Sequence, residues 1–264
     1  MKLRFGTFLA PCIMPVYEAI TEEVGRQLGV KTELIVETDY ESCAQDKNDV
    51  CFVCSLPYIE FMRQGISPAV PIAAPVLRGN RYGGKPIYYS DVIVHSASPY
   101  QSFGDLRGRS WAYNEPLSHS GYGITRYHMV KIGQTNGFFA KVIEAGFHEE
   151  SIRLVSEGGV DASAIDSQVL AVATRDNPSL RKSLRVIEAL GPSTIQPIAV
   201  SKRLPMELRQ QILEIILSLH KDTKVRRRLA VGLVERFAPV GPSSYDDIRK
   251  MVDVCEREKF MVIR

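Results

Sequence analysis

Short apolar runs of strand length alternate with longer runs of helical periodicity along almost the whole of this 264-residue chain. Such alternation is typical of α/β proteins, in which helices connect the strands of a largely parallel sheet. A chain of this length can bury an ample core, as one domain or as two lobes. We expect strands at 2–8, 32–36, 49–53, 70–77, 87–94, 111–113, 160–165 and 184–189, and helices at 15–28, 57–64, 120–132, 148–156, 167–175, 205–220 and 245–256.

The charge balance limits the partners that the chain can have. Its 33 basic and 30 acidic side chains leave a net charge of only +3, which is no electrostatic footprint for nucleic acid. The basic run 221–228 follows a helical pattern, and we interpret it as a solvated helix face. No stretch is apolar enough to predict a transmembrane helix. We therefore expect no nucleic-acid partner and no membrane-embedded segment.

Cysteine usage and the first residues bear on the compartment. Cys51 and Cys54 form a Cys-x-x-Cys pattern, but on a strand followed by a loop, where neither a redox motif nor a zinc site is expected. Buried thiols without a disulfide pattern fit a reducing compartment. Prolines interrupt the apolar run after Lys2 and Arg4, so the pattern predicts no signal peptide. We expect a cytoplasmic protein from the sequence as written, or a periplasmic one if an export signal has been removed.

The segment 114–123, Asn-Glu-Pro-Leu-Ser-His-Ser-Gly-Tyr-Gly, predicts an anion site. Ser118 and Ser120 flank His119 just before an amphipathic run, and serine is a preferred residue at the start of a helix. The first turn of a helix offers free N–H groups and the positive end of the helix dipole. The two hydroxyls can add donors to these N–H groups. The alternative is an ordinary capped helix start.

Further short motifs follow one another in an order that resembles a known family. These motifs mark strands, turns and helix starts, and they lie at 3–6, 28–40, 48–52, 86–94, 144–151 and 157–167. Together with the Ser-His-Ser turn, they resemble the phosphate/phosphonate-binding proteins of ABC transporters, within the type II periplasmic-binding-protein fold. The resemblance covers most of the chain and weakens after about residue 200.

The resemblance implies an α/β protein of two lobes joined by two hinge crossings. The crossings are expected near 94–98 and 197–201. Lobe one would comprise residues 1–94 and 200–264, and lobe two residues 95–199. A ligand would bind between the lobes at the carboxyl ends of strands, where open α/β sheets usually bind ligands.

The resemblance also suggests the ligand-binding residues. They match positions of the family's motifs or, for Ser55, lie in a turn expected to form the wall of lobe one: Tyr40, Ser55, Tyr88, Ser118, His119, Ser120, His148 and Asp166. His148 would donate to an anion oxygen. With an ordinary imidazole pKa near ~6.5, its protonation would strengthen binding as the pH falls. The structural alternatives are core packing for the tyrosines, a helix start for His148 and a helix cap for Asp166.

Two amides depart from the family's pattern. Members that bind an aminoalkyl phosphonate carry acids that hold the ammonium group, and the corresponding positions here are Gln168 and Gln196. We therefore expect inorganic phosphate, phosphite, methylphosphonate or another small anion as the ligand.

Three hypotheses for the function remain open. The first is a solute-binding protein that delivers a small anionic ligand to an ABC transporter permease, and the second is a cytoplasmic sensor or carrier on the same fold. The third is an enzyme acting on a small phosphorylated or heterocyclic substrate, because a related fold serves as an iron-dependent pyrimidine synthase for thiamine and the site offers Ser, His and Asp side chains. The sequence has no Gly-x-Ser-x-Gly elbow and no Cys-rich iron motif. We expect a binding protein with no catalytic residues, no metal and no cofactor.

Overall fold

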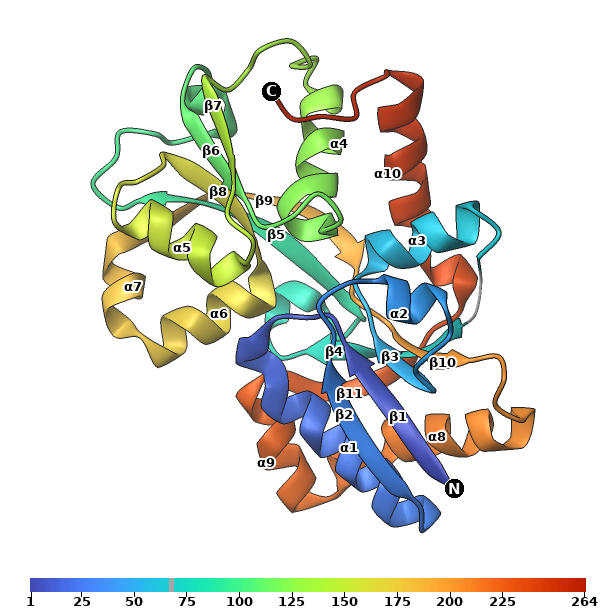
Figure 1. The fold of residues 1–264 in the computed structure, drawn as a ribbon. Coiled ribbons are helices and arrows are strands. Elements are labelled where there is room, and N and C mark those ends of the chain that lie inside the picture. Colours follow the sequence, from blue (N-terminus) through green and yellow to red (C-terminus); the bar gives the residue numbers. More distant parts are fainter. Residues whose placement is uncertain (67–68) are drawn as a thin grey trace. The chain divides into compact units, whose positions relative to one another are not determined.

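Two units, each built around its own sheet, make up the chain in the computed structural model, which describes residues 1–66 and 69–264 (Figure 1). Unit 1 comprises Met1–Ile87 and Thr194–Asp246. Unit 2 comprises Tyr88–Ser193 and Asp247–Arg264. The expected α/β architecture of two lobes is therefore confirmed, and each unit is assembled from two separate stretches of the chain.

The sheet of unit 1 has six strands in the order β11-β4-β10-β3-β1-β2. Strand β1 is parallel to β2 and β3, whereas β10 is antiparallel to both β3 and β4, and β11 is antiparallel to β4. The helices of this unit are α1 (Met14–Leu28), α2 (Glu41–Ala44), α3 (Ser55–Arg63), α8 (Met206–Ser218) and α9 (Thr223–Val231). The strands are β1 (Lys2–Thr7), β2 (Lys31–Val36), β3 (Val50–Phe52), β4 (Ala69–Leu77), β10 (Ile198–Ser201) and β11 (Val234–Pro239).

The sheet of unit 2 has five strands in the order β7-β6-β8-β5-β9. Strand β6 is parallel to β7 and β8, and β5 is antiparallel to β8. The helices are α4 (Ile124–Lys131), α5 (His148–Ser156), α6 (Ser167–Asp176), α7 (Pro178–Ser183) and α10 (Asp246–Arg257). The strands are β5 (Ile87–His95), β6 (Ser110–Tyr113), β7 (Lys141–Glu144), β8 (Ala162–Asp166) and β9 (Leu184–Thr194).

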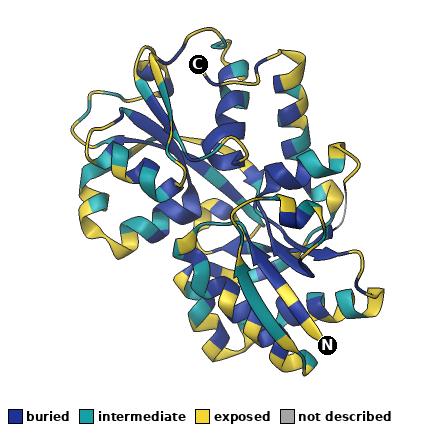
Figure 2. Cartoon of the chain, in the orientation of Figure 1, coloured by how far each residue is buried: buried dark blue, intermediate teal, exposed yellow. Residues whose placement is uncertain are grey.

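Both sheets are mixed, which corrects the expectation of largely parallel sheets. The helix α3 connects β3 to β4, so these two strands run in the same direction. The chain then returns from unit 2 through β10, which enters between them in the opposite direction. The sequence pattern did not predict β7, β10 or β11, each of which is six residues or shorter. The central strands of each sheet are mainly buried, and the helices present exposed residues to solvent (Figure 2).

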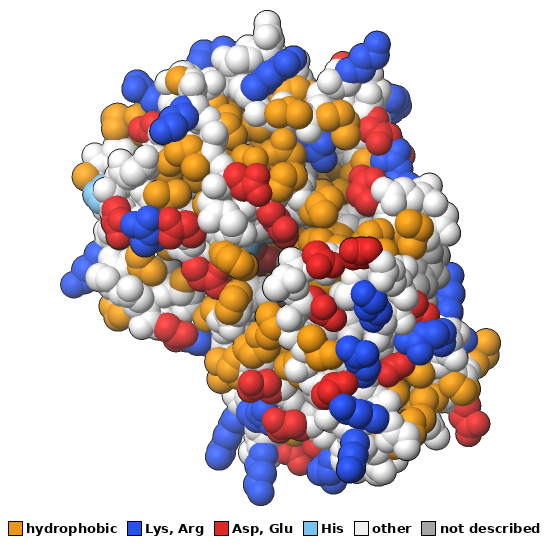
Figure 3. All heavy atoms as spheres, in the orientation of Figure 1, with side chains coloured by type: hydrophobic (Ala, Val, Ile, Leu, Met, Phe, Trp, Pro, Cys, Tyr) orange, Lys and Arg blue, Asp and Glu red, His pale blue; other side chains and the backbone are white. Residues whose placement is uncertain are grey.

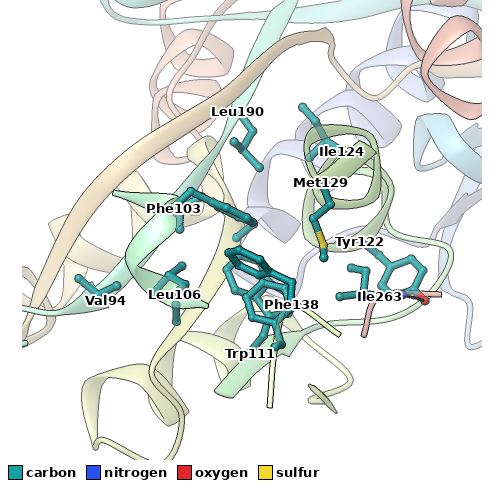
Figure 4. Close-up of a cluster of buried hydrophobic side chains, with 14 of the residues drawn as sticks. Val94, Phe103, Leu106, Trp111, Tyr122, Ile124, Met129, Phe138, Leu190 and Ile263 are labelled. Atoms are coloured by element: carbon teal, nitrogen blue, oxygen red, sulfur yellow. Dashed lines mark hydrogen bonds between the residues drawn. The ribbon is translucent and has the colours of Figure 1, made fainter. Parts of the chain in front are cut away.

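An aromatic cluster forms the core of unit 2. The ring of Trp111 stacks on Phe139 with centroids 4.8 Å apart, and Phe103 stacks on Phe138 with centroids 5.4 Å apart. Figure 4 shows Phe103, Trp111 and Phe138 together, with Ile263 beside Tyr122. Ile263, the residue before the last one of the sequence, thus contributes to the same core as the strands and α4.

The C-terminal segment belongs to unit 2, which corrects its assignment to lobe one. Residues 200–264 were expected in lobe one, but 247–264 pack in unit 2. The physical reason is that Phe260 and Ile263 are apolar side chains buried in the aromatic cluster of unit 2. The chain therefore passes between the units a third time, after Asp246, in addition to passing after Ile87 and after Ser193.

The basic run 221–228 lies mostly on exposed positions at and within α9, as expected for a solvated helix face. Val225 and Leu229 point inward, and Arg228 forms ion pairs with Glu22 and Glu18 of α1. Basic and acidic side chains are intermixed on the face shown in Figure 3. Among the described residues, no helix combines the length and the apolar character needed to cross a membrane.

Candidate functional site

The Ser-His-Ser segment forms a π-helical turn, η4 (His119–Gly123), that leads from β6 into α4. The N–H group of Gly123 donates to the carbonyl of Ser118 at 2.9 Å. Ser118 caps the turn, because its Oγ accepts the N–H group of Gly121 at 3.1 Å. The predicted α-helix therefore begins four residues late, at Ile124, and a wider turn precedes it. Such π-helical turns are frequent at functional sites.

Close packing of Asn114 explains why a glycine follows the two serines. A Cβ atom on Gly121 would lie only 1.9 Å from Oδ1 of Asn114. Asn114 also accepts the N–H group of Gly146 at its backbone carbonyl, at 2.7 Å. This bond joins the loop before η4 to the loop before α5. The first residue of α5, His148, is thereby held beside η4.

Ser118, Ser120 and His148, three of the predicted ligand-binding residues, form one hydrogen-bonded cluster. Oγ of Ser120 lies 2.9 Å from Nε2 of His148 and 3.4 Å from Oγ of Ser118. All three residues are buried. In the part of the chain that the structure describes, Nδ1 of His148 has no hydrogen-bond partner. Burial lowers the pKa of His148 to about 4, so its imidazole is neutral near pH 7.

His119 points to a different set of partners. Its Nε2 lies 3.0 Å from Oγ of Ser193 in β9, and its ring centroid lies 6.4 Å from that of Tyr88 in β5. Burial, and secondarily the charge of Arg126, lower the pKa of His119 to about 3. Both histidines of this region are therefore uncharged at neutral pH. The expected ordinary pKa near ~6.5 for His148 was wrong, because the imidazole is almost completely buried.

Asp166 lies at the carboxyl end of β8 and caps α6, which is the structural alternative that the sequence analysis gave for it. Its carboxylate accepts the N–H groups of Gln168 at 2.7 Å and Val169 at 3.4 Å. Strand β8 packs against η4, so Asp166 ends the strand on which the turn rests. In the paired strand β5, Oγ of Ser90 is buried opposite Asp166 without a hydrogen-bond partner among the described residues.

Tyr40 and Ser55 belong to unit 1. Tyr40 precedes α2 and stacks on Phe8, with ring centroids 5.0 Å apart. Ser55 is the first residue of α3 and fully buried, and within the described residues its hydroxyl has no hydrogen-bond partner. Their participation in ligand binding, like that of Tyr88, His119 and Asp166, stays a prediction.

Three residues near the cluster were not singled out from the sequence. Asn114 packs on Gly121, Ser193 pairs with His119, and Arg126 lies buried two residues after the start of α4. Asn114 and Gly121 are part of the motif that predicted the site. Ser193 meets the site only through tertiary packing. Arg126 follows η4 directly in the sequence, but the pattern gives no sign that it is buried.

The geometry supplies hydrogen-bond donors for a small anion. Ser118 already accepts the N–H groups of residues 121–123, so those of His119 and Ser120 are the ones that the start of η4 leaves for a ligand. Two serine hydroxyls and an imidazole lie beside them. Within residues 1–66 and 69–264, no group of three His, Cys, Asp or Glu side chains is placed to hold a metal ion. The described cysteines are all free thiols, and Cys12 alone is only partly buried among them.

Comparison with known proteins gives the family. A model of the family described as "ABC transporter, phosphonate, periplasmic substrate-binding protein" matches residues 13–245. A phosphonates-binding periplasmic protein of Escherichia coli (strain K12) is 24% identical over 245 residues, which cover 88% of this chain and 68% of that protein. The chain therefore belongs to the phosphonate periplasmic substrate-binding proteins of ABC transporters.

Solved structures share the fold. A binding-protein component of an ABC phosphonate transporter from Pseudomonas aeruginosa superposes with a TM-score of 0.84 at 17% identity, covering 98% of this chain and 87% of that one. A protein of Prochlorococcus marinus in complex with methylphosphonate gives 0.83 at 17% identity, covering 98% of both chains. The family description is periplasmic, which agrees with the location expected where an export signal has been removed and does not support a cytoplasmic one.

Proposed function

We propose that this chain binds a small phosphorus oxyanion at the Ser118–Ser120–His148 cluster and delivers it to the permease of an ABC transporter. The hydrogen-bonded cluster at the start of η4 is the observation that carries the proposal. The E. coli relative is named for phosphonates, and the Prochlorococcus marinus structure contains methylphosphonate. A helix start with added hydroxyl donors is a suitable place for such an anion.

The hydrogen bonds of the cluster leave the serine protons available to a ligand. Ser118 already uses its oxygen to accept the N–H group of Gly121. When the proton of His148 is on Nε2, the imidazole donates to Oγ of Ser120. One of the two hydroxyl protons lies in the 3.4 Å contact between the serines, so one hydroxyl donates outward at once and the second can do so when an anion displaces that contact. The neutral His148 orients Ser120 in this arrangement and carries no charge itself.

The preferred ligands lack an ammonium group. Gln168 and Gln196 stand where aminoalkyl-phosphonate binders of the family carry acids, and an amide offers no charge to a cation. Gln168 is buried at the start of α6, next to the cap formed by Asp166. We therefore propose phosphate, phosphite or methylphosphonate in preference to an aminoalkyl phosphonate. We also keep Tyr40, Ser55, Tyr88, His119 and Asp166 as proposed ligand-binding residues.

The enzyme hypothesis is less well supported. Ser120 and His148 resemble a nucleophile and its base, but a Ser-His-Asp site needs an acid on the other ring nitrogen. Among the described residues, Nδ1 of His148 has no such partner. A base with a pKa of about 4 also accepts protons poorly at neutral pH. The family itself consists of substrate-binding proteins.

The direct test is calorimetry of the purified protein with phosphate, phosphite, methylphosphonate and 2-aminoethylphosphonate. Native mass spectrometry of the same protein would reveal a co-purified anion. Substituting Ser118→Ala or Ser120→Ala should cost about 1–3 kcal/mol of binding free energy, because a hydrogen bond to a charged group is lost. Ser156→Ala, at the opposite end of α5, is the matched control and should bind like the parent.

The outcomes separate the hypotheses. Binding that weakens in both serine variants but not in Ser156→Ala supports the proposed site. Unchanged affinity in both variants means that the anion binds elsewhere. If none of the four ligands binds the parent protein, the proposed ligand class is wrong.

A further inference from the structure

Arg126 is a buried cation that has no carboxylate partner in the part of the chain that the structure describes. Its side chain lies in α4 and the residue is 5% exposed. Within the described residues, Nη1 donates to the carbonyl of Met261 at 3.1 Å, and no carboxylate lies at ion-pair distance. Its Nε is buried and makes no hydrogen bond to any described residue. Buried arginines are almost always paired with an acid, because a lone charge is costly to remove from water.

The partners of Arg126 fix the guanidinium against η4. The guanidinium lies over the ring of Tyr122, 5.2 Å from its centroid. The hydroxyl of Tyr122 accepts the N–H group of Ile263 at 3.2 Å, and Met261 supplies the carbonyl for Arg126. The C-terminal segment therefore holds both residues. Tyr122 is itself part of η4, so the cation is tied to the turn that carries Ser120.

The positive charge of Arg126 changes the pKa values of neighbouring groups. It lowers the pKa of His119, whose imidazole is buried between Ser193 and Tyr88. It also lowers the pKa of the thiol of Cys255 in α10, although burial outweighs this effect. Inside a protein such a field is weakly screened, and neither His119 nor His148 adds a charge at neutral pH. Arg126 is thus a fixed positive charge near η4 that lacks a negative partner among the described residues.

We propose that Arg126 is the counter-charge of the anion bound at η4, acting through space behind the turn, and that it makes the site prefer dianions to monoanions. The inference rests on the proposed function, because the missing negative partner is then the ligand itself. Neutral donors alone would discriminate weakly between the two charge states. A fixed cation favours the dianion, since the Coulomb energy grows with the charge of the ligand.

The test compares methylphosphonate with its monomethyl ester, at a pH where the first is a dianion and the second a monoanion. Arg126→Gln removes the charge but keeps a donor for the carbonyl of Met261. The affinity of the Arg126→Gln variant for the dianion should fall by on the order of tenfold or more. The fall in its affinity for the monoanionic ester should be about half as large on a logarithmic scale, because the ester carries half the charge. Arg126→Lys keeps the charge and should retain the parent's preference for the dianion.

Arg185→Gln is the matched control. Arg185 also donates to backbone carbonyls, those of Ser98 and Tyr100, but it lies near the start of β9, whereas Ser193 lies near its end. This variant should leave both affinities unchanged. If Arg126→Gln and Arg126→Lys weaken both ligands by the same factor, the role of Arg126 is structural and the proposal is overturned. If the parent binds neither ligand, the proposed function fails instead.

A measurement on the unaltered protein covers the case in which the glutamine variant does not fold. The amide of Ile263 donates to Tyr122, so its hydrogen exchange reports on the segment that holds Arg126. At equal saturation, the dianion should slow this exchange more than the monoester does. Equal slowing by the two ligands would contradict a counter-charge at Arg126.

Discussion

At the scale of residues, the Ser118–Ser120–His148 cluster and the neighbouring His119 are neutral groups. His119 and His148 have pKa values lowered to about 3 and about 4, and in both cases burial is the main cause. An anion bound at η4, as proposed, would therefore meet hydroxyls, N–H groups and uncharged imidazoles. Such donors bind anions without a competing salt bridge to break. The same burial means that the two imidazole rings do not take up a proton in the folded protein until the pH is well below neutral.

These lowered pKa values predict how stability depends on pH. An unfolded chain binds protons on both histidines near ~6.5, whereas the folded chain does not until pH about 4 for His148 and about 3 for His119. The stability that the two neutral histidines allow is fully present above pH ~6.5 and is lost as the pH falls below that value. The free energy of unfolding should drop by about 1.4 kcal/mol per pH unit for each histidine. Urea unfolding across this range measures the slope.

His148→Gln serves as the reference for this prediction. Glutamine does not titrate, so in this variant the free energy of unfolding should change with pH by the amount due to one histidine, His119, and no longer by the amount due to two. A slope identical to that of the parent would show that His148 is not the titrating group. The same pKa implies that the affinity of the parent for a ligand of constant charge should change little near neutral pH.

At the scale of elements, the turn η4 depends on the absence of a side chain at Gly121. A Cβ atom there would lie 1.9 Å from Oδ1 and 3.0 Å from Cγ of Asn114. Gly121→Ala should therefore destabilise the protein by about 1–3 kcal/mol and weaken anion binding, because the turn must open. Adding Asn114→Ala removes the clash and should restore part of both losses. Thermal unfolding and calorimetry of the single and double variants test the coupling.

Gly104→Ala is the control for this pair. A Cβ atom on Gly104 would make only an ordinary contact, 3.6 Å from Oγ of Ser102. The variant should change stability by less than about 1 kcal/mol. If Gly121→Ala is equally mild, Asn114 rotates away freely and the turn does not require glycine.

The elements also show how far the sequence could predict this site. Ser118, Ser120 and His148 share a hydrogen-bonded cluster because their motifs carry local signals: a cap, a glycine turn and a helix start. Arg126 has no such signal, since an arginine in an amphipathic helix is usually solvated. Arg126 is buried because it contacts Met261, which lies 135 residues further along the chain, and the ring of Tyr122, which lies one helical turn before it.

The same distinction holds for the fold. Long alternating segments predicted their strands and helices well, because periodicity is a local property. The strands β10 and β11 are short. Pro197 directly precedes β10 and Pro239 is the last residue of β11, and these prolines weakened the strand signal of both segments. The place of residues 247–264 depends on which unit buries Phe260 and Ile263. No local pattern carries that information.

At the scale of the whole molecule, the C-terminal segment should stabilise unit 2 selectively. Phe260 and Ile263 are each 3% exposed within the aromatic cluster. Phe260→Ala or Ile263→Ala should cost about 2–5 kcal/mol, because each leaves a cavity in this core. Hydrogen exchange followed by mass spectrometry should show faster opening of unit 2 peptides than of unit 1 peptides. Fluorescence of Trp111, the sole tryptophan, should report the same loss in unit 2.

Val262→Ala is the neighbouring control, because Val262 is exposed. It should leave the exchange of both units unchanged within experimental error. Equal acceleration of the two units in Phe260→Ala would mean that they unfold as one cooperative body, and the selective effect would be absent.

The three passages of the chain between its units also constrain when each unit can fold during synthesis. Domains usually fold in order as a ribosome adds roughly 5–20 residues per second. Here unit 1 gains β10 only at Ser201 and β11 only at Pro239, and unit 2 receives residues 247–264 after both. A nascent chain therefore carries two unfinished cores while residues 88–239 are being added. Both can close only within a few seconds of each other, once residues 240–264 have followed.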